Sequence, residues 1–137
     1  MIIDSNFRKY WLPEEHITID EGLICFKGKF LNRVHIQEKP NATGLKIYTI
    51  ADGSKYLWSF WLYDGEKLAI DDVVLDFVHK LPNKHSKVYL DSWYGSEKLA
   101  ISLHNEGYLF VMACGKNKTA DIFNNYLDLG LTSGQVR

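Results

Sequence analysis

The first half of the chain alternates apolar and polar residues with the two-residue period of a β-strand. Ile17 and Ile19, for example, alternate with polar neighbours, as expected where one face of a strand packs on a core. The pattern predicts five short strands, at residues 17–20, 23–26, 33–37, 45–51 and 56–63. Asp52-Gly53 is a strong turn signal between the last two, so we expect these two to form an antiparallel hairpin.

In the second half of the chain the period changes to that of an amphipathic helix. Apolar residues between 74 and 81 recur at i, i+3, i+4 and i+7, which predicts a helix with one apolar face. Asp71 and Asp72 suit its first turn, and a proline follows its end. A second helix is expected from a cap at Ser96 to a stop at Gly107.

Three further elements complete the predicted order. Residues 87–91 are a strand candidate, the unbroken apolar run at 108–113 indicates a buried central strand, and residues 119–129 are typical of a last helix. Strands followed by alternating helices and strands predict an α/β sheet with crossover helices. The ribonuclease H-like mixed sheet has this order, with antiparallel opening strands and then parallel ones, although periodicity alone does not choose it over other mixed sheets.

Composition and charge place the chain among ordinary globular proteins. Hydrophobic residues make up 46% and charged residues 24% of the 137 residues, which suits one domain over residues 1–137 and excludes a coiled coil or a disordered chain. A formal charge of −1 excludes a polybasic nucleic-acid binder, so only a local patch could serve that purpose. The sequence shows neither a secretory signal nor a membrane-spanning run, and we expect a protein that is not secreted.

Several reactive or aromatic side chains have a structural interpretation. Cys25 and Cys114 form no CxxC pair and lie in apolar runs, so we expect reduced cysteines buried in the core, typical of the cytosol. Three histidines between residues 79 and 104 lack the spacing of a zinc site and are expected on the surface. Trp58 and Trp61 are three positions apart in one strand, which puts them on opposite faces and at least one in the core.

Two acids stand out because each ends an apolar strand. Asp20 ends Ile-Thr-Ile-Asp, and Asp91 ends Val-Tyr-Leu-Asp. If the two strands are neighbours, the carboxylates meet at one edge of the sheet, where they could share a divalent cation, because Mg²⁺ prefers oxygen ligands. Such a site supports phosphodiester cleavage. The alternative is that both acids are turn or cap residues that face water.

A local basic segment could contact a nucleic acid. Residues 27–46 hold five basic residues against one acid, Glu38: Lys27, Lys29, Arg33, Lys39 and Lys46. Lys116 and Lys118 form a second small cluster, and Trp93, two residues after Asp91, could shape the site or stack on a base. The alternative is a solvated face of strands and loops.

Five segments resemble, in order, the motifs of piggyBac-type transposases. They are Thr18-Ile19-Asp20-Glu21 followed by Phe26-Lys27-Gly28, Lys39-Pro40 with Gly44-Leu45-Lys46, Asp52 with Tyr56, Asp91-Ser92-Trp93-Tyr94-Gly95-Ser96, and Gly115-Lys116-Asn117-Lys118. The resemblance covers about residues 10–118. It implies an incomplete ribonuclease H-like fold and metal-dependent cleavage and joining of DNA strands.

The family uses three aspartates, and the resemblance carries the first onto Asp20 and the second onto Asp91. The third lies well downstream in the family, and Asp121 and Asp128 do not stand in its context. The resemblance therefore implies a fragment of a catalytic core that binds Mg²⁺ or Mn²⁺ weakly and is inactive alone. It also implies transposon and target DNA as partners, a homodimer, and a nuclear location.

Two other interpretations stay open. The chain could be a domesticated or decayed transposon-derived module that binds DNA or protein without catalysis. It could also be an unrelated α/β domain whose acids only cap strands.

Overall fold

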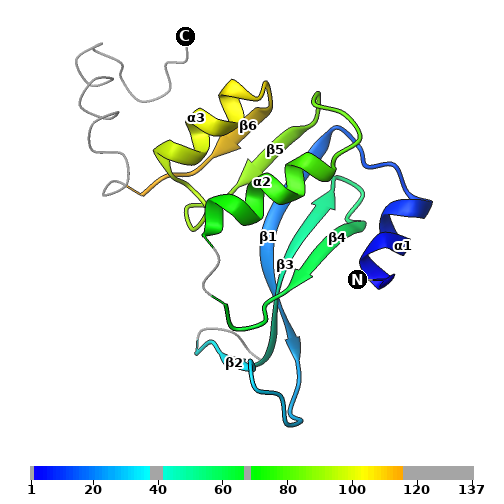
Figure 1. Ribbon diagram of the computed structural model, residues 1–137, viewed down its shortest axis with the longest axis vertical. Helices are drawn as coiled ribbons and strands as arrows, with labels where there is room; N and C mark the ends of the chain where they lie inside the picture. Colours follow the sequence, from blue (N-terminus) through cyan, green and yellow to red (C-terminus); the bar gives the residue numbers. More distant parts are fainter. Residues whose placement is uncertain (1, 38–41, 67–68, 116–137) are drawn as a thin grey trace.

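The computed structural model describes residues 2–37, 42–66 and 69–115, which form a mixed β-sheet with helices packed on it (Figure 1). The elements, in chain order, are α1 (Ile2–Tyr10), β1 (His16–Cys25), β2 (Val34–His35), β3 (Thr43–Asp52), β4 (Leu57–Leu62), α2 (Ile70–Lys80), β5 (Lys87–Leu90), α3 (Glu97–Asn105) and β6 (Leu109–Met112). The helix expected at residues 119–129 lies outside the described residues.

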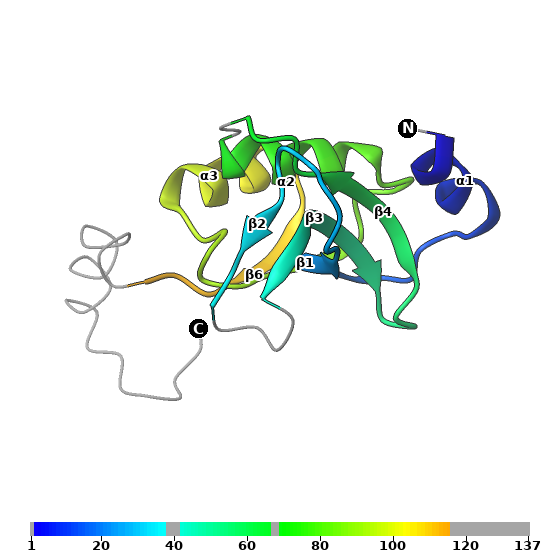
Figure 2. The same ribbon diagram turned by 90° about the horizontal axis from the view of Figure 1, so that it is seen from below.

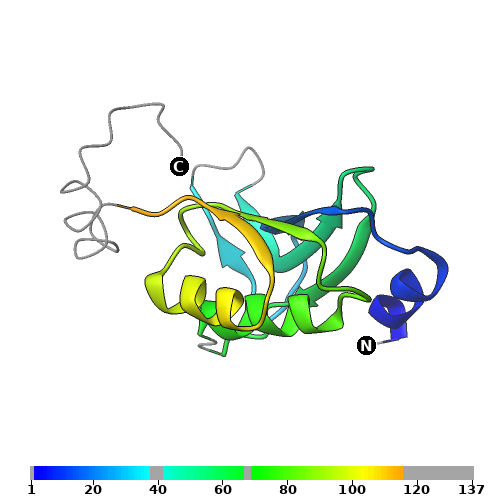
Figure 3. The ribbon, with the colours of Figure 1, turned by 90° about the horizontal axis from the view of Figure 1, so that it is seen from above.

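The sheet joins an antiparallel part to a parallel part. Its strand order is β2-β3-β1-β5-β6, and β4 also pairs with β3. β1, β3 and β4 pair antiparallel, whereas β5 runs parallel to β1 and β6 runs parallel to β5. The crossover helices α2 and α3 lie on the same face of the sheet (Figures 2 and 3). This is the ribonuclease H-like order that the sequence predicts, so the expected fold class is confirmed.

The core lies between the sheet and the two crossover helices. Inward-facing strand residues include Ile17, Ile19 and Val88, and α2 contributes Val74 and Phe77. Each large apolar side chain buried in this way stabilises the fold by roughly 1.5–3 kcal/mol. The alternation of buried and exposed residues along β1 follows from this packing, since successive side chains point to opposite faces.

β1 is one long strand where the sequence pattern suggests two. All of it pairs with β3, from Ile17 opposite Asp52 to Cys25 opposite Gly44. Its second half projects with β3 beyond the helices, toward β2 (Figure 1). The expectation of a buried Cys25 is wrong, because the residue sits on this projection and is exposed.

Two other strand predictions need correction. The strand expected at residues 33–37 is reduced to Val34–His35. β6 is not a central strand, because among the described residues it pairs only with β5 and forms an edge of the sheet. Leu109 and Val111 are accordingly exposed, while Phe110 and Met112 pack toward the core. An unbroken apolar run therefore indicates a strand here, but not its central position.

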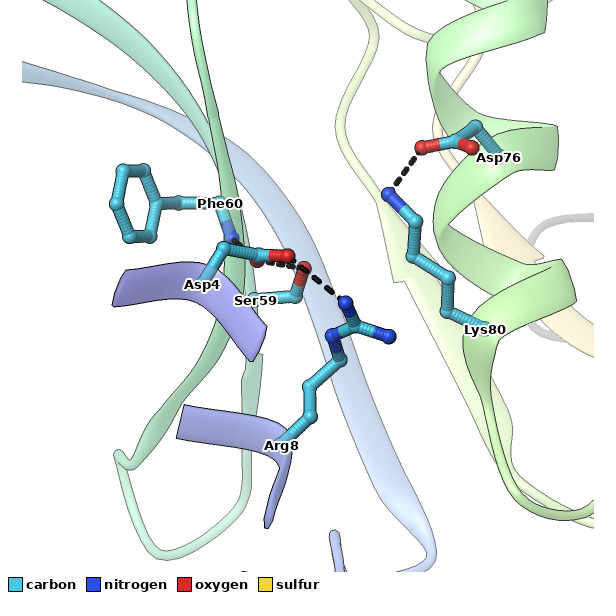
Figure 4. A network of polar contacts seen from close by, with 6 residues as sticks. All are labelled: Asp4, Arg8, Ser59, Phe60, Asp76 and Lys80. Atoms are coloured by element: carbon cyan, nitrogen blue, oxygen red, sulfur yellow. Dashed lines mark hydrogen bonds and ion pairs between the residues drawn. The ribbon is translucent and has the colours of Figure 1, made fainter. Parts of the chain in front are cut away.

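Helix α1 is absent from the sequence prediction and is held by contacts to a distant strand (Figure 4). The buried Asp4 carboxylate accepts hydrogen bonds from the Ser59 hydroxyl and, at 3.0 Å, from the Phe60 amide. Arg8, one turn later, donates to the other oxygen of Asp4 at 3.0 Å. Burial alone raises the pKa of Asp4, but these hydrogen bonds and the Arg8 charge outweigh it, so the pKa lies below its ordinary value.

A second buried carboxylate, Asp52, closes the β3–β4 turn. One oxygen accepts from the Ser54 amide and hydroxyl and from the Tyr56 amide. The other accepts from Trp11 Nε1 at 2.6 Å and from the Glu14 amide at 3.3 Å. Burial raises the pKa of Asp52, yet the hydrogen bonds outweigh that effect and the pKa is lowered. Asp52 therefore ties the segment after α1 to the hairpin.

The predicted turn and cap residues are in place. Ser96 caps α3, with its hydroxyl accepting from the Leu99 amide at 3.1 Å. Gly107 follows α3 with a φ of 81°, a left-handed conformation that suits glycine at the end of a helix. Trp58 is buried and Trp61 packs partly buried against the core, so at least one of these tryptophans is a core residue, as expected.

Among the described residues, no helix has both the length and the apolar character that a membrane span requires.

Candidate functional site

The parallel pairing of β1 with β5 brings the two candidate acids to one edge of the sheet. Ile19 lies opposite Leu90 in the register of these strands. Asp20 and Asp91 are the next residues after this pair, and both are exposed. The expectation that Asp20 ends a strand is wrong, because β1 continues to Cys25 and Asp20 lies within it, whereas Asp91 directly follows the end of β5. Because the two strands run in the same direction, this part of β1 lies beside the carboxyl end of β5. The structure thus places the two aspartates next to each other in the sheet.

Each aspartate is held by the backbone beside it. Asp20 Oδ1 accepts from the Glu21 amide at 2.7 Å, and Asp91 Oδ1 accepts from the Trp93 amide at 2.8 Å. Asp91 also starts a turn, since the Gly95 amide donates to its carbonyl oxygen at 3.2 Å. The bond of Asp91 is typical of an acid that starts a turn, and both bonds restrict the direction of the carboxylates.

Gly95 lets this turn approach the end of β6 closely. A Cβ atom at this position would lie 2.1 Å from the Ala113 carbonyl oxygen, a distance that backbone atoms cannot accommodate without moving. Any larger residue would therefore push the turn away from β6. The glycine keeps Asp91 and Trp93 at the edge of the sheet.

Glu21 is a third carboxylate at this edge, and the sequence analysis does not single it out. Burial raises its pKa, the charges of Asp20 and Asp91 raise it further, and the ammonium group of Lys46 opposes them. Since this coupling needs short distances, the three acids form one electrostatic cluster. The signal that the sequence carries is the two-residue period of the strand, which puts Glu21 on the same face as Ile17 and Ile19.

Tyr94 forms the inner wall of the cluster. The residue is 1% exposed, and its hydroxyl donates to Glu21 Oε2 at 3.4 Å. Burial raises the pKa of Tyr94 strongly, and the charges of Glu21 and Asp20 add to that effect. The phenol therefore stays neutral and remains a hydrogen-bond donor toward the carboxylates.

Lys46 supplies the positive charge at this edge. Its Nζ lies 5.0 Å from the centre of the Tyr48 ring and 5.2 Å from that of Trp93. Lys46 and Trp93, both predicted as DNA-contacting residues, are thus neighbours beside the carboxylates. A pocket of about 420 Å³ opens here and is lined by both of them.

Asp20 and Asp91 have the chemistry to bind a hard divalent cation, although two residues are a small set of ligands. Asp20 and Asp91 offer carboxylate oxygens, which Mg²⁺ and Mn²⁺ prefer. The charges of both aspartates raise the pKa of Glu21, and the nearby Lys46 charge lowers it. Over residues 2–37, 42–66 and 69–115, however, no group of three or more histidine, cysteine, aspartate or glutamate side chains is arranged to hold a metal ion.

The other basic residues occupy the loop between β1 and β2. Lys27, Lys29 and Arg33 line a shallow hollow of about 480 Å³, and the Arg33 guanidinium donates to the carbonyl oxygens of Lys27 and Gly28 at 3.2 and 3.0 Å. This loop lies at the end of the β1–β3 projection (Figure 1). These three residues and Lys46 therefore line different hollows.

Three predicted DNA-contacting residues, Lys39, Lys116 and Lys118, lie outside the described residues, as do Asp121 and Asp128. The three histidines lie on the surface, and Nε2 of His79 is 2.6 Å from Glu106 Oε2.

A comparison with known protein families gives the class of protein to which this fold belongs. The family model described as "Transposase IS4" matches residues 2–125, so the chain belongs to this transposase family.

A piggyBac transposase, solved as a synaptic complex with hairpin DNA, has a similar structure. The TM-score is 0.78 at 24% sequence identity, and the match covers 98% of this chain and 29% of the piggyBac chain. The likeness establishes a shared fold. Together with the family match, it confirms the transposase resemblance that the five motifs predict. The chain spans less than a third of the length of this solved relative.

Proposed function

We propose that this chain is part of a piggyBac-like transposase catalytic core in which Asp20 and Asp91 hold a divalent metal ion for cleavage and joining of DNA strands. The observation that carries the proposal is the parallel register of β1 and β5, which sets both acids at one edge. Membership in a transposase family supports the same assignment.

In this proposal, residues of the chain bind the metal ion and orient its ligands. Asp20 and Asp91 would be the metal ligands, with one oxygen of each fixed by the Glu21 or Trp93 amide. When bound, Mg²⁺ or Mn²⁺ supplies charge stabilisation at the phosphate oxygens. Glu21 and the neutral Tyr94 would set the charge and hydrogen bonding behind the aspartates.

Two aspartates alone form a weak metal-binding site. Catalytic ions about 3.5–4 Å apart repel each other and need more negative charge than two carboxylates supply. We therefore expect weak metal binding and no transposition by this polypeptide alone.

DNA is the proposed partner. Lys27, Lys29 and Arg33 sit on an exposed loop, where they could neutralise backbone phosphates, and Lys46 lies beside the carboxylates. Such contacts make binding weaken steeply with salt. A nuclear location and pairing of two copies are supported by the family resemblance alone.

The absence of a three-acid metal group among the described residues favours a second candidate. In it, the chain is a transposon-derived module that keeps the fold and binds DNA without catalysis.

Thermal unfolding with and without Mn²⁺ tests the metal site. We expect Mn²⁺ to raise the melting temperature of the wild type, because a ligand that binds only the folded state stabilises it. Asp20→Asn and Asp91→Asn should remove this shift.

Asp72→Asn is the matched control, since Asp72 is an exposed acid at the start of α2. It should keep the full shift. If Mn²⁺ shifts all four proteins equally, or shifts none, the proposed metal site is wrong.

A further inference from the structure

The pocket beside the carboxylates is lined by aromatic, apolar and charged side chains. Three aromatic residues, three apolar residues, one lysine and one acid line it: Tyr48, Tyr63, Trp93, Val34, Ile36, Ile70, Lys46 and Glu66. We call this hollow the aromatic–lysine pocket. Tyr48 is buried, whereas Trp93 is 53% exposed, so the pocket has a fixed floor and an accessible aromatic wall.

Lys46 is held in place inside this pocket. Its Nζ lies about equally far from two rings, 5.0 Å from that of Tyr48 and 5.2 Å from that of Trp93. Its backbone is also fixed, because the Tyr63 amide donates to the Lys46 carbonyl oxygen at 2.9 Å. The lysine therefore presents a localised positive charge between aromatic faces.

The pocket adjoins the proposed metal ligands directly. Trp93 is bound to the Asp91 carboxylate through its amide, and Tyr48 is the register partner of Glu21 in the β1–β3 pair. A group in the pocket would thus lie next to a phosphate held at Asp20 and Asp91.

We propose that the aromatic–lysine pocket binds one unpaired nucleotide of a DNA strand, next to the bond held at the carboxylates. The exposed Trp93 face can stack on a base, and the Lys46 ammonium can neutralise its phosphate. A base within a duplex is already stacked on both sides, so only an unpaired base can use this wall. This inference rests on the proposed function.

Equilibrium binding of fluorescein-labelled DNA tests the inference on the whole chain. Two probes differ at one position: a duplex with one unpaired nucleotide, and the same duplex with an abasic residue there. We expect the wild type to bind the probe with the unpaired nucleotide about tenfold more tightly, because stacking of one base on an aromatic ring contributes about this much affinity.

Variants assign the effect to the pocket. Trp93→Ala should bind the two probes equally, and Trp93→Phe, which keeps a ring, should retain most of the preference. Lys46→Met should weaken binding of both probes and reduce the salt slope by about one. The matched control is Lys84→Met, because Lys84 lies 5.2 Å from the Tyr108 ring, far along the chain from the pocket, and it should behave as the wild type.

The outcomes separate the two proposals. Salt-dependent binding of both probes with equal affinity, or a preference that survives in Trp93→Ala, overturns the pocket and leaves the DNA-binding function standing. Failure of the wild type to bind either probe at low salt overturns the DNA-binding function and the pocket together.

Discussion

Asp4 and Asp52 show how single buried carboxylates hold this fold together. Each accepts hydrogen bonds from groups distant in the chain, Asp4 from β4 and Asp52 from the segment after α1. Removing such an acceptor leaves several donors without partners, a loss that costs more than the net worth of the bonds. Sequence reasoning recognises Asp52 as a turn residue but gives no indication of its bond to Trp11.

The lowered pKa values of Asp4 and Asp52 predict a loss of stability in acid. The folded state binds their protons more weakly than the unfolded state does, whose ordinary value is 3.8. Their contribution is therefore complete above that value and is lost as the pH falls through the lower folded pKa. Urea unfolding at a series of pH values should show a free energy of unfolding that falls below about pH 4.

Asp52→Asn tests this assignment. It should be less stable than the wild type at neutral pH by about 1–3 kcal/mol, and its stability should fall less in acid. Asp72→Asn should follow the wild-type curve. An acid dependence as steep in Asp52→Asn as in the wild type would contradict the role given to this carboxylate.

The cap of α3 is a local element that the sequence predicts correctly. The Ser96 hydroxyl accepts from the Leu99 amide and donates to Asp71 Oδ1 at 3.1 Å, which also joins the starts of α3 and α2. Ser96→Ala should lower the free energy of unfolding by about 1 kcal/mol, measured by urea denaturation. Ser102→Ala, inside the same helix, should have little effect, and equal losses in both variants would show that capping is not the cause.

Elements governed by local pattern could be predicted, and those governed by distant contacts could not. The periodicity of α2 and the alternation in β3 are visible in the sequence because one face of each packs on the core. α1 escaped prediction because its anchor is the contact of Asp4 with Ser59, which no local pattern reveals. The sequence pattern divides β1 in two because Glu21 stands where the alternation requires an apolar residue and Gly22 follows it.

At the scale of the molecule, the candidate site depends on which strands are neighbours. The sequence marks Asp20 and Asp91 as acids at strand ends. Asp91 does follow β5, whereas Asp20 lies inside the longer β1, and the parallel β1–β5 pair brings the two acids together. Glu21, Tyr94 and the contact of Lys46 with Trp93 become visible only in the folded chain, because they join residues from three parts of the sequence. The roles of Asp20 and Asp91 as metal ligands remain predictions.

Amide NMR spectra of isotopically labelled protein, recorded during addition of Mn²⁺, test the shared metal site most directly. A bound paramagnetic ion broadens the signals of nearby nuclei, so signals of Glu21 and Trp93, next to the two aspartates, should disappear first. Those of α1 should persist, and Asp20→Asn should abolish the selective loss. Broadening centred on other acids, such as Asp71 and Asp72, or spread evenly over the protein, would contradict a metal site shared by Asp20 and Asp91.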